Sequence, residues 1–180
     1  VKKTMNNLGI DGTIIMGGDG HLLQAHNLFE SGINVVGWPK TIVNDLSETF
    51  FSAGYLTAVE VGAKRIRYAS MNAQTNEKKN ILHVFGRDTD WLVAGIGGYG
   101  LADLIIPCEQ NYTFDQIYEK IQKAADDNEA NYGRRFAVVV AGERAYMAGL
   151  DSQFYDVKSS TSGLYSKADP LRLASELKKA

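Results

Sequence analysis

Short apolar segments alternate with longer amphipathic segments along most of the chain. The apolar segments are rich in β-branched and aromatic residues, which is typical of strands covered on both faces in a parallel sheet. They predict five strands, at residues 12–16, 34–38, 81–85, 102–107 and 136–141.

The amphipathic segments predict helices at residues 21–32, 50–73, 90–100 and 113–133, with the end of a further helix at residues 1–9. Thr113 and Gly133 suit the two ends of the last of these, because threonine caps helix N-termini and glycine readily adopts the left-handed conformation that ends many helices. Strands that alternate with helices predict an α/β fold of three layers, built on a doubly wound and mostly parallel sheet.

The length of 180 residues predicts one domain over residues 1–180. Residues 151–169 are rich in Ser, Tyr and Gly without a clear period, so a loop is predicted there, followed by a terminal helix at residues 170–179. The glycine-rich residues 95–100 are interpreted as close helix packing rather than as a phosphate loop. Ligands of doubly wound sheets bind beyond the carboxyl ends of the strands, and four polar loops fall there.

Composition narrows the possible partners. The net charge of −2 gives no general attraction for nucleic acid or for an anionic membrane, so a bound anion must be held by local groups. No apolar run approaches the roughly 20 residues of a membrane span. Cys108 is the single cysteine, which excludes an internal disulfide and fits a cytoplasmic protein.

The first polar loop is GGDG, in which Gly17, Gly18 and Gly20 surround Asp19. Glycines allow a tight turn and close approach of a ligand, and the helix that follows directs free N–H groups at a phosphate. Asp19 repels phosphate unless Mg²⁺ lies between them. The alternative is an ordinary strand-to-helix turn with Asp19 as the N-cap.

The second polar loop is PKTIVND, which offers the Lys40 ammonium, the Thr41 hydroxyl and the Asp45 carboxylate. Together with Asp19 these groups suit phosphoryl transfer by positioning and charge neutralisation. The alternative is a solvated surface loop.

Two further loops follow later strands. VFGRDTDW provides Arg87, whose guanidinium suits a phosphate or a carboxylate, although Asp88 or Thr89 would also serve simply as a helix cap. AGERA provides Glu143, which would accept hydrogen bonds from sugar hydroxyls.

The segments GIDGTIIMGGDG, INVVGWPKTIVND, FFSAGYLTAVE, ILHVFGRDTDWLVA and ADLIIPCEQ, in this order and spacing, resemble the 6-phosphofructokinase family. The resemblance runs from Gly9 to about Glu143. GGDG alone also occurs in NAD and lipid kinases, but its combination with PKTI-x-ND and GR-x-x-x-W is specific and argues against those kinases.

The resemblance implies transfer of a phosphoryl group from ATP, or from pyrophosphate in some branches, to the 1-hydroxyl of fructose 6-phosphate in glycolysis. Asp19 matches the magnesium-associated aspartate, and Thr41 and Asp45 match the signature PKTIDND near the transferred group. The matching glycines of the nucleotide-side turn are Gly17, Gly18 and Gly20.

The resemblance also implies a sugar-phosphate site. Gly86 and Arg87 match the segment that contacts the sugar phosphate, with Phe85 in place of a methionine, and Glu143 matches a glutamate that binds sugar hydroxyls. The expected cofactors are Mg²⁺ and ATP. Gly20 leaves space for an ATP α-phosphate, whereas Lys40 is usual in the pyrophosphate branch, so pyrophosphate is the alternative donor.

Val43 departs from the family pattern, because it occupies the position of the aspartate expected as the base. Loss of a general base typically lowers the rate by about 10²–10⁴-fold. The chain is therefore predicted to be a weak or inactive phosphotransferase, and the alternative is a non-catalytic protein that binds nucleotide or sugar phosphate.

The resemblance further implies a domain that is incomplete at both ends. The family's first glycine-rich loop would lie upstream of Val1, and later basic ligands of the sugar phosphate would lie beyond Ala180. Self-association into a homo-oligomer is expected, because a sheet without its neighbours exposes edges and apolar faces.

Overall fold

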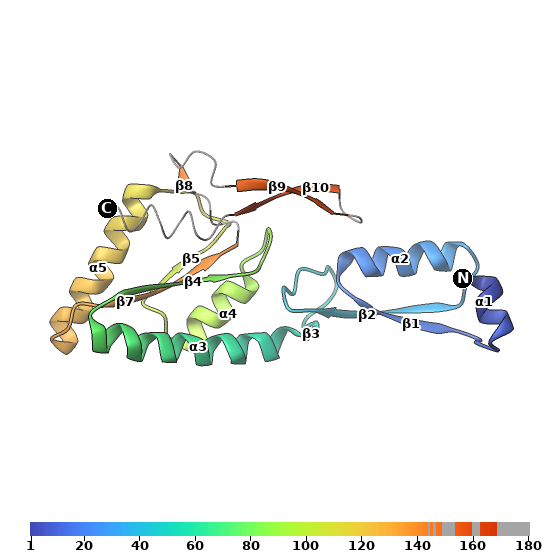
Figure 1. Cartoon of the computed structure of the whole chain (residues 1–180), viewed down its shortest axis with the longest axis horizontal. Coiled ribbons are helices and arrows are strands. Elements are labelled where there is room, and N and C mark those ends of the chain that lie inside the picture. The colour runs from blue at the N-terminus through green and yellow to red at the C-terminus, as the bar shows by residue number, and fades with distance from the viewer. Residues whose placement is uncertain (144, 146, 149–153, 160–162, 169–180) are drawn as a thin grey trace. The chain divides into compact units, whose positions relative to one another are not determined.

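The computed structural model describes residues 1–143, 145, 147–148, 154–159 and 163–168. The chain divides into two compact units: unit 1 comprises Val1–Tyr55 and unit 2 comprises Leu56–Ala180. Figure 1 labels most helices and strands of both units.

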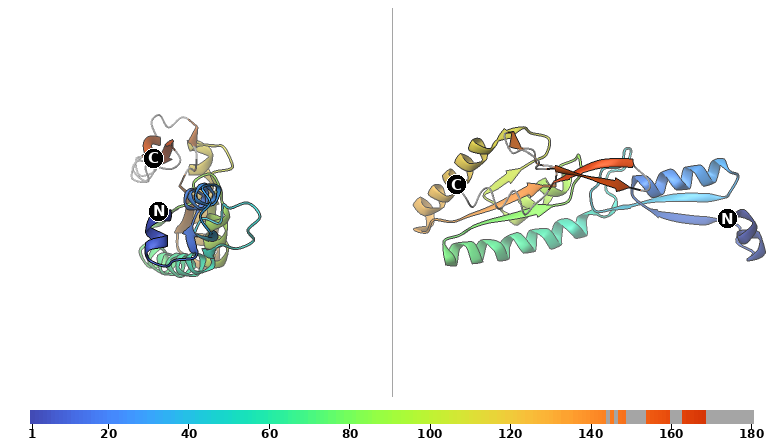
Figure 2. Two further views of the ribbon diagram at one scale, coloured as in Figure 1. Left: turned by 90° about the vertical axis from the view of Figure 1, so that its right-hand side faces the viewer. Right: turned by 45° about the horizontal axis from the view of Figure 1, so that its top comes forward.

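Unit 1 is built around a three-stranded parallel sheet with the order β1-β2-β3. Its elements are α1 (Lys2–Asn7), β1 (Thr13–Gly17), α2 (Asp19–Glu30), β2 (Val35–Thr41) and β3 (Ala53–Gly54). Helix α2 connects β1 to β2 and packs against both strands (Figures 1 and 2). Because β1 and β2 are parallel and in register from Thr13↔Val35 to Gly17↔Pro39, both strands end at the same edge of the sheet.

Unit 2 contains a second parallel sheet with the order β4-β7-β5. Its helices are α3 (Tyr55–Asn76), α4 (Trp91–Gly100) and α5 (Phe114–Tyr132). The first residue of α3, Tyr55, is the last residue of unit 1. Its strands are β4 (Lys79–Val84), β5 (Leu104–Ile106), β6 (Tyr112–Thr113), β7 (Ala137–Gly142), β8 (Met147–Ala148), β9 (Phe154–Ser159) and β10 (Gly163–Ala168).

The core of unit 2 lies on both faces of β7, and all six residues of this strand are buried. Ala137, Val139 and Ala141 share one cluster with Ile117 and Ile121 of α5. Successive side chains of a strand point to opposite faces, so the residues between them face the other side, and α4 also packs against β7. Unit 2 therefore has helices on both faces of its sheet.

Close packing of α4 depends on its glycines. A Cβ at Gly97 would lie 2.6 Å from the Ile105 side chain, and one at Gly100 would lie 2.6 Å from Ile66 of α3. The interpretation of residues 95–100 as a packing segment is confirmed at Gly97 and Gly100, whereas a Cβ at Gly98 would meet open space.

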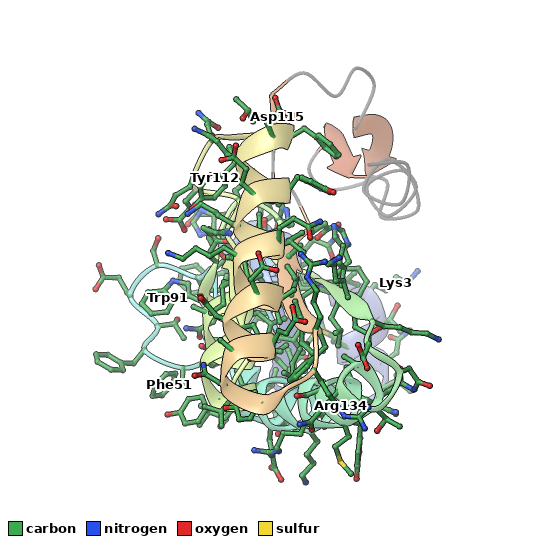
Figure 3. All side chains as sticks on the ribbon, turned by 90° about the vertical axis from the view of Figure 1, so that its left-hand side faces the viewer. Lys3, Phe51, Trp91, Tyr112, Asp115 and Arg134 are labelled. Atoms are coloured by element: carbon green, nitrogen blue, oxygen red, sulfur yellow. The ribbon has the colours of Figure 1, made fainter. Side chains whose placement is uncertain are left out.

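Figure 3 labels Tyr112 and Asp115 near one end of α5 and Arg134 near the other. Both ends of this helix follow their sequence signals. The Thr113 hydroxyl accepts the Gln116 N–H at 3.2 Å, and the Gln116 side chain accepts the Thr113 N–H at 2.9 Å, which completes a capping box. Gly133 ends the helix in the left-handed conformation at φ 69°. Both predicted caps are confirmed.

The α/β class with parallel strands is also confirmed, and β1, β2, β4, β5 and β7 correspond to the five predicted strands. One sheet was expected, but these strands belong to two. Strand pairing is a long-range property, and the local apolar pattern that identifies a strand does not identify its neighbours.

Residues 151–169, for which a loop was predicted, contain β9 and β10, which pair antiparallel from Ser159↔Gly163 to Phe154↔Ala168. Backbone hydrogen bonds do not depend on the type of side chain, so this pair can form without the apolar pattern that identified the other strands. The helix predicted at residues 170–179 lies outside the described residues. Among the helices that the structure describes, none is long and apolar enough to cross a membrane.

Candidate functional site

The GGDG turn joins β1 to α2 in unit 1. Gly18 is the N-cap of α2, with φ −83° and ψ −166°, and Asp19 begins the first turn, so the alternative with Asp19 as N-cap is wrong. A Cβ at Gly17 would lie 2.3 Å from the Cβ of His21, which explains the need for glycine there. The first four N–H groups of a helix have no partner within it, and with the helix dipole they favour an anion.

The loop PKTIVND begins within β2, beside this turn. A Cβ built on Gly18 would lie 3.7 Å from the Cβ of Thr41, which is ordinary van der Waals contact. The structure thus brings together two predicted site residues, Gly18 and Thr41, at the carboxyl ends of two parallel strands.

A set of uncharged side chains braces the loop that follows Thr41. The Val43 N–H donates to the Thr41 hydroxyl at 3.1 Å, and the Ser52 hydroxyl donates to the Thr41 carbonyl at 2.7 Å. Asn44 is buried in the left-handed conformation at φ 59°. Its side chain accepts the Ser52 N–H at 2.8 Å and donates to the Phe50 carbonyl at 3.2 Å. These bonds close the loop between residues 41 and 52.

The other predicted residues of unit 1 differ in exposure. Lys40, Asp19 and, in part, Gly20 are accessible, whereas Asp45 and Val43 are half-buried. Among the residues that the structure describes, no group of three or more His, Cys, Asp or Glu side chains could hold a metal. Mg²⁺ is usually bound by one or two carboxylates together with phosphate oxygens and water, so the single Asp19 carboxylate fits this ion.

The loop FGRDTD follows β4 in unit 2 as a tight turn. The Thr89 N–H donates to the Gly86 carbonyl at 3.0 Å, and a Cβ at Gly86 would lie 2.6 Å from the Thr89 carbonyl oxygen. Arg87 has φ 50°, a left-handed conformation that costs about 1–2 kcal/mol for a residue with a side chain. Phe85, just before the turn, is exposed.

Glu143 follows β7 and reaches this turn. Its Oε2 accepts the N–H of Gly86 at 3.4 Å and the N–H of Arg87 at 3.3 Å. The two segments meet because β4 and β7 are paired in register up to Val84↔Gly142. The structure thus brings together three predicted site residues: Gly86, Arg87 and Glu143.

A second carboxylate, that of Asp90, organises the neighbouring strand end. It accepts the N–H of Cys108 at 2.8 Å and that of Glu109 at 2.9 Å, while the Asp90 N–H donates to Glu109 Oε1 at 3.3 Å. Burial first, and the Asp90 carboxylate second, raise the pKa of the Cys108 thiol to about 12.

Sequence reasoning missed the residues that brace these loops. Asn44 lies inside the motif PKTIVND, and its left-handed conformation could have been predicted, because asparagine is enriched among left-handed residues. Nothing local in the sequence indicated the roles of Ser52 and Asp90. Ser52 forms hydrogen bonds with residues 8 and 11 positions away, and Asp90 forms them with residues 18 and 19 positions away.

Comparison with known proteins identifies the family. The Phosphofructokinase family model matches residues 1–172. The chain belongs to the phosphofructokinase family. This phosphofructokinase homologue is 33% identical over 143 residues to the ATP-dependent 6-phosphofructokinase 2 of Clostridium perfringens, covering 79% of this chain and 38% of that protein. It is 30% identical over 150 residues to the pyrophosphate–fructose 6-phosphate 1-phosphotransferase of Amycolatopsis mediterranei, covering 83% and 42% of the two chains.

Solved phosphofructokinases share the fold. The structure from Saccharomyces cerevisiae matches 79% of this chain and 22% of its own, with a TM-score of 0.67 and 23% identity. The pyrophosphate-dependent phosphofructokinase from Marinobacter aquaeolei matches 81% of this chain and 39% of its own, with a TM-score of 0.65 and 24% identity. The chain thus spans about two fifths of the length of the curated phosphofructokinases it matches.

Proposed function

We propose that the chain contributes to phosphoryl transfer from ATP or pyrophosphate to the 1-hydroxyl of fructose 6-phosphate. The proximity of Gly18 to Thr41 carries the proposal, because it places a glycine turn at a helix N-terminus beside a hydroxyl at the end of the adjacent strand. Relatives named as ATP-dependent and as pyrophosphate-dependent enzymes support this reaction class.

On the donor side, the residues of unit 1 bind and orient phosphate groups. Gly17, Gly18 and Gly20 let the phosphates approach the first N–H groups of α2, and Lys40 supplies a positive charge. The Thr41 hydroxyl accepts the Val43 N–H, so its own proton remains available for a phosphoryl oxygen. Asp19 would hold Mg²⁺, which neutralises phosphate charge when it is bound.

On the acceptor side, Gly86, Arg87 and Glu143 of unit 2 bind the sugar phosphate. The Arg87 guanidinium suits the phosphate group, because its fixed fork of donors matches phosphate oxygens. Glu143 Oε2 accepts two backbone N–H groups, and its carboxylate has further acceptor capacity for a sugar hydroxyl.

ATP is the donor that Gly20 favours, because a side chain there would occupy the space of the α-phosphate. A coupled assay for fructose 1,6-bisphosphate, run with ATP and separately with pyrophosphate, tests this choice. Turnover with ATP that exceeds turnover with pyrophosphate supports it, and the reverse order overturns it.

The reaction is expected to be weak, because the aliphatic Val43 cannot accept the proton of the sugar hydroxyl. Changing Val43→Asp in the full chain should raise the rate of the coupled assay by about 10²-fold or more, the usual contribution of a general base. Val43→Asn is the matched control, because an amide of the same shape is not a base. Equal rates for both variants would contradict a base at this position.

A second candidate function is binding without catalysis, which Val43 itself favours. Calorimetry would then detect Mg-ATP or fructose 6-phosphate binding, while both Val43→Asp and the unchanged chain would show no turnover. Turnover by Val43→Asp excludes this candidate.

Homo-oligomerisation stays a prediction. Ile14, Met16, Val36 and Trp38 are exposed on β1 and β2, and apolar positions of this kind favour association. Sedimentation equilibrium of the full chain tests it, and a monomer at micromolar concentration would contradict it.

A further inference from the structure

Glu143 is a buried carboxylate at the end of β7. Within the described part of the chain, four polar side chains are buried, and Glu143, at 7% exposure, is the only charged one among them. Burial of a carboxylate is unfavourable unless hydrogen bonds satisfy its oxygens. Here the donors are two successive backbone N–H groups, those of Gly86 and Arg87.

The turn that donates these hydrogen bonds is strained. Arg87 is left-handed, and Gly86 has no space for a Cβ because the Thr89 carbonyl lies too close. A strained backbone conformation persists only where several surrounding contacts hold it in place. Thr89 holds the turn from within, through its N–H and hydroxyl to the Gly86 carbonyl, and Glu143 holds it from the adjacent strand.

We infer that Glu143 is a positioning residue for Arg87. Its carboxylate fixes the left-handed turn, and the turn sets the backbone from which the Arg87 guanidinium binds the phosphate of the sugar phosphate. The inference rests on the proposed function and deepens it, because it gives Glu143 an action on phosphate binding that needs no contact with the sugar.

Inorganic phosphate separates the two roles of Glu143. This probe has no sugar hydroxyls, so a direct contact between Glu143 and the sugar leaves its affinity unchanged. An effect of Glu143 on phosphate affinity must instead pass through the turn that carries Arg87.

The test uses calorimetry on the full chain with inorganic phosphate and with fructose 6-phosphate. Glu143→Ala should weaken phosphate binding about tenfold, the loss expected when hydrogen bonds to a charged group are removed. Glu143→Gln keeps an acceptor oxygen and should restore most of the affinity. In an Arg87→Ala background, Glu143→Ala should add no further loss, because the two changes act through one contact.

Asn128→Ala is the matched control. Asn128 is also buried, and its side chain donates to the Phe136 carbonyl at 3.0 Å, just before the start of β7, whereas Glu143 follows its end. The Asn128→Ala substitution removes a comparable buried hydrogen bond and should leave phosphate affinity unchanged.

Amide hydrogen exchange supplies a readout that needs no ligand. The Gly86 and Arg87 amides should exchange at least about tenfold faster in Glu143→Ala than in the unchanged chain. Unchanged exchange overturns the positioning role, as does a loss of fructose 6-phosphate affinity without a loss of phosphate affinity. If the unchanged chain binds neither probe, the proposed function fails, even where exchange shows that Glu143 holds the turn.

Discussion

The two parallel sheets differ in how much of their surface is buried. Every residue of β7 in unit 2 is buried, whereas Ile14 on β1 is 62% exposed and Trp38 on β2 is 53% exposed. Parallel sheets are usually covered on both faces, as the sheet of unit 2 is. Two strands with similar apolar patterns therefore contribute very differently to stability, and the main core belongs to unit 2.

The loops at the ends of the two sheets are also held differently. In unit 1 the loop after Thr41 is closed by the neutral side chains of Asn44 and Ser52. In unit 2 the carboxylates of Glu143 and Asp90 accept pairs of backbone N–H groups. Short hydrogen bonds to ionised groups are stronger than neutral ones, so the segment that Asp90 holds at 2.8 and 2.9 Å should be the most rigid, whereas the Glu143 bonds are longer, at 3.3 and 3.4 Å.

The largest expected difference between the units is in core packing. Ile117→Ala in α5 removes a fully buried side chain and should lower the free energy of unfolding by about 2–5 kcal/mol. Ile14→Ala removes the same atoms from an exposed position and should change it by no more than about 0.5 kcal/mol. Urea denaturation measures the free energy of unfolding of both variants, and equal losses would contradict the difference between the two sheets.

The second expected effect concerns Cys108, beside Asp90. Because the pKa of this thiol is raised from 9.0 to about 12, alkylation at pH 8 should be about 10²–10³-fold slower in the folded than in the unfolded chain. A raised thiol pKa stabilises the fold below pH 9, and this contribution is lost as the pH rises toward 12. Rates of iodoacetamide labelling against pH test this.

Asp90→Asn should lower the pKa of the Cys108 thiol and speed its alkylation, since it removes the second cause of the shift. Labelling of the folded chain as fast as that of the unfolded chain would show that this sheet end is open to solvent.

A smaller effect is expected at the helix caps. Thr113→Ala breaks the capping box of α5 and should lower stability by about 1 kcal/mol, while Thr113→Ser should retain most of it. The cap of α2 is Gly18, which has no side chain to bond the first N–H groups. Thermal denaturation compares the two variants, and an unchanged melting temperature for Thr113→Ala would contradict the role of the box.

The smallest effect is expected on the surface of α3. Lys64 and Glu60 form an ion pair of 2.6 Å, and the Lys64 side chain lowers the pKa of Glu60, but both side chains are largely exposed. Exposed pairs contribute little and are screened by salt. Lys64→Ala should leave the urea midpoint unchanged in 0.5 M salt, and a clear shift there would mean that the pair is structurally important.

Much of the local structure was predictable from the sequence. The five strands, the main helices and the caps Thr113 and Gly133 depend on near neighbours, and the structure bears them out. The packing role of Gly97 and Gly100 was also predicted, although Gly100 packs against Ile66 of another helix, α3. The predicted loop at residues 151–169 missed β9 and β10, because an antiparallel pair can form there without a hydrophobic period.

Of the candidate site, sequence identified the residues but not their connections. Nothing in the segments FGRD and GERA indicated that Glu143 would accept the N–H groups of Gly86 and Arg87, which are 57 and 56 positions away. The catalytic and binding roles of the site residues stay predictions, which the experiments above address.

The sequence by itself determined the family, the α/β class and the presence of Val43 in place of the expected base, because motifs, periodicity and residue identity are local. Only the tertiary structure decided that the strands form two sheets, that Gly18 lies beside Thr41 and that the buried Glu143 holds a left-handed Arg87. Those features depend on which strands pair and where they end, and long-range pairing brings together residues that no local pattern connects.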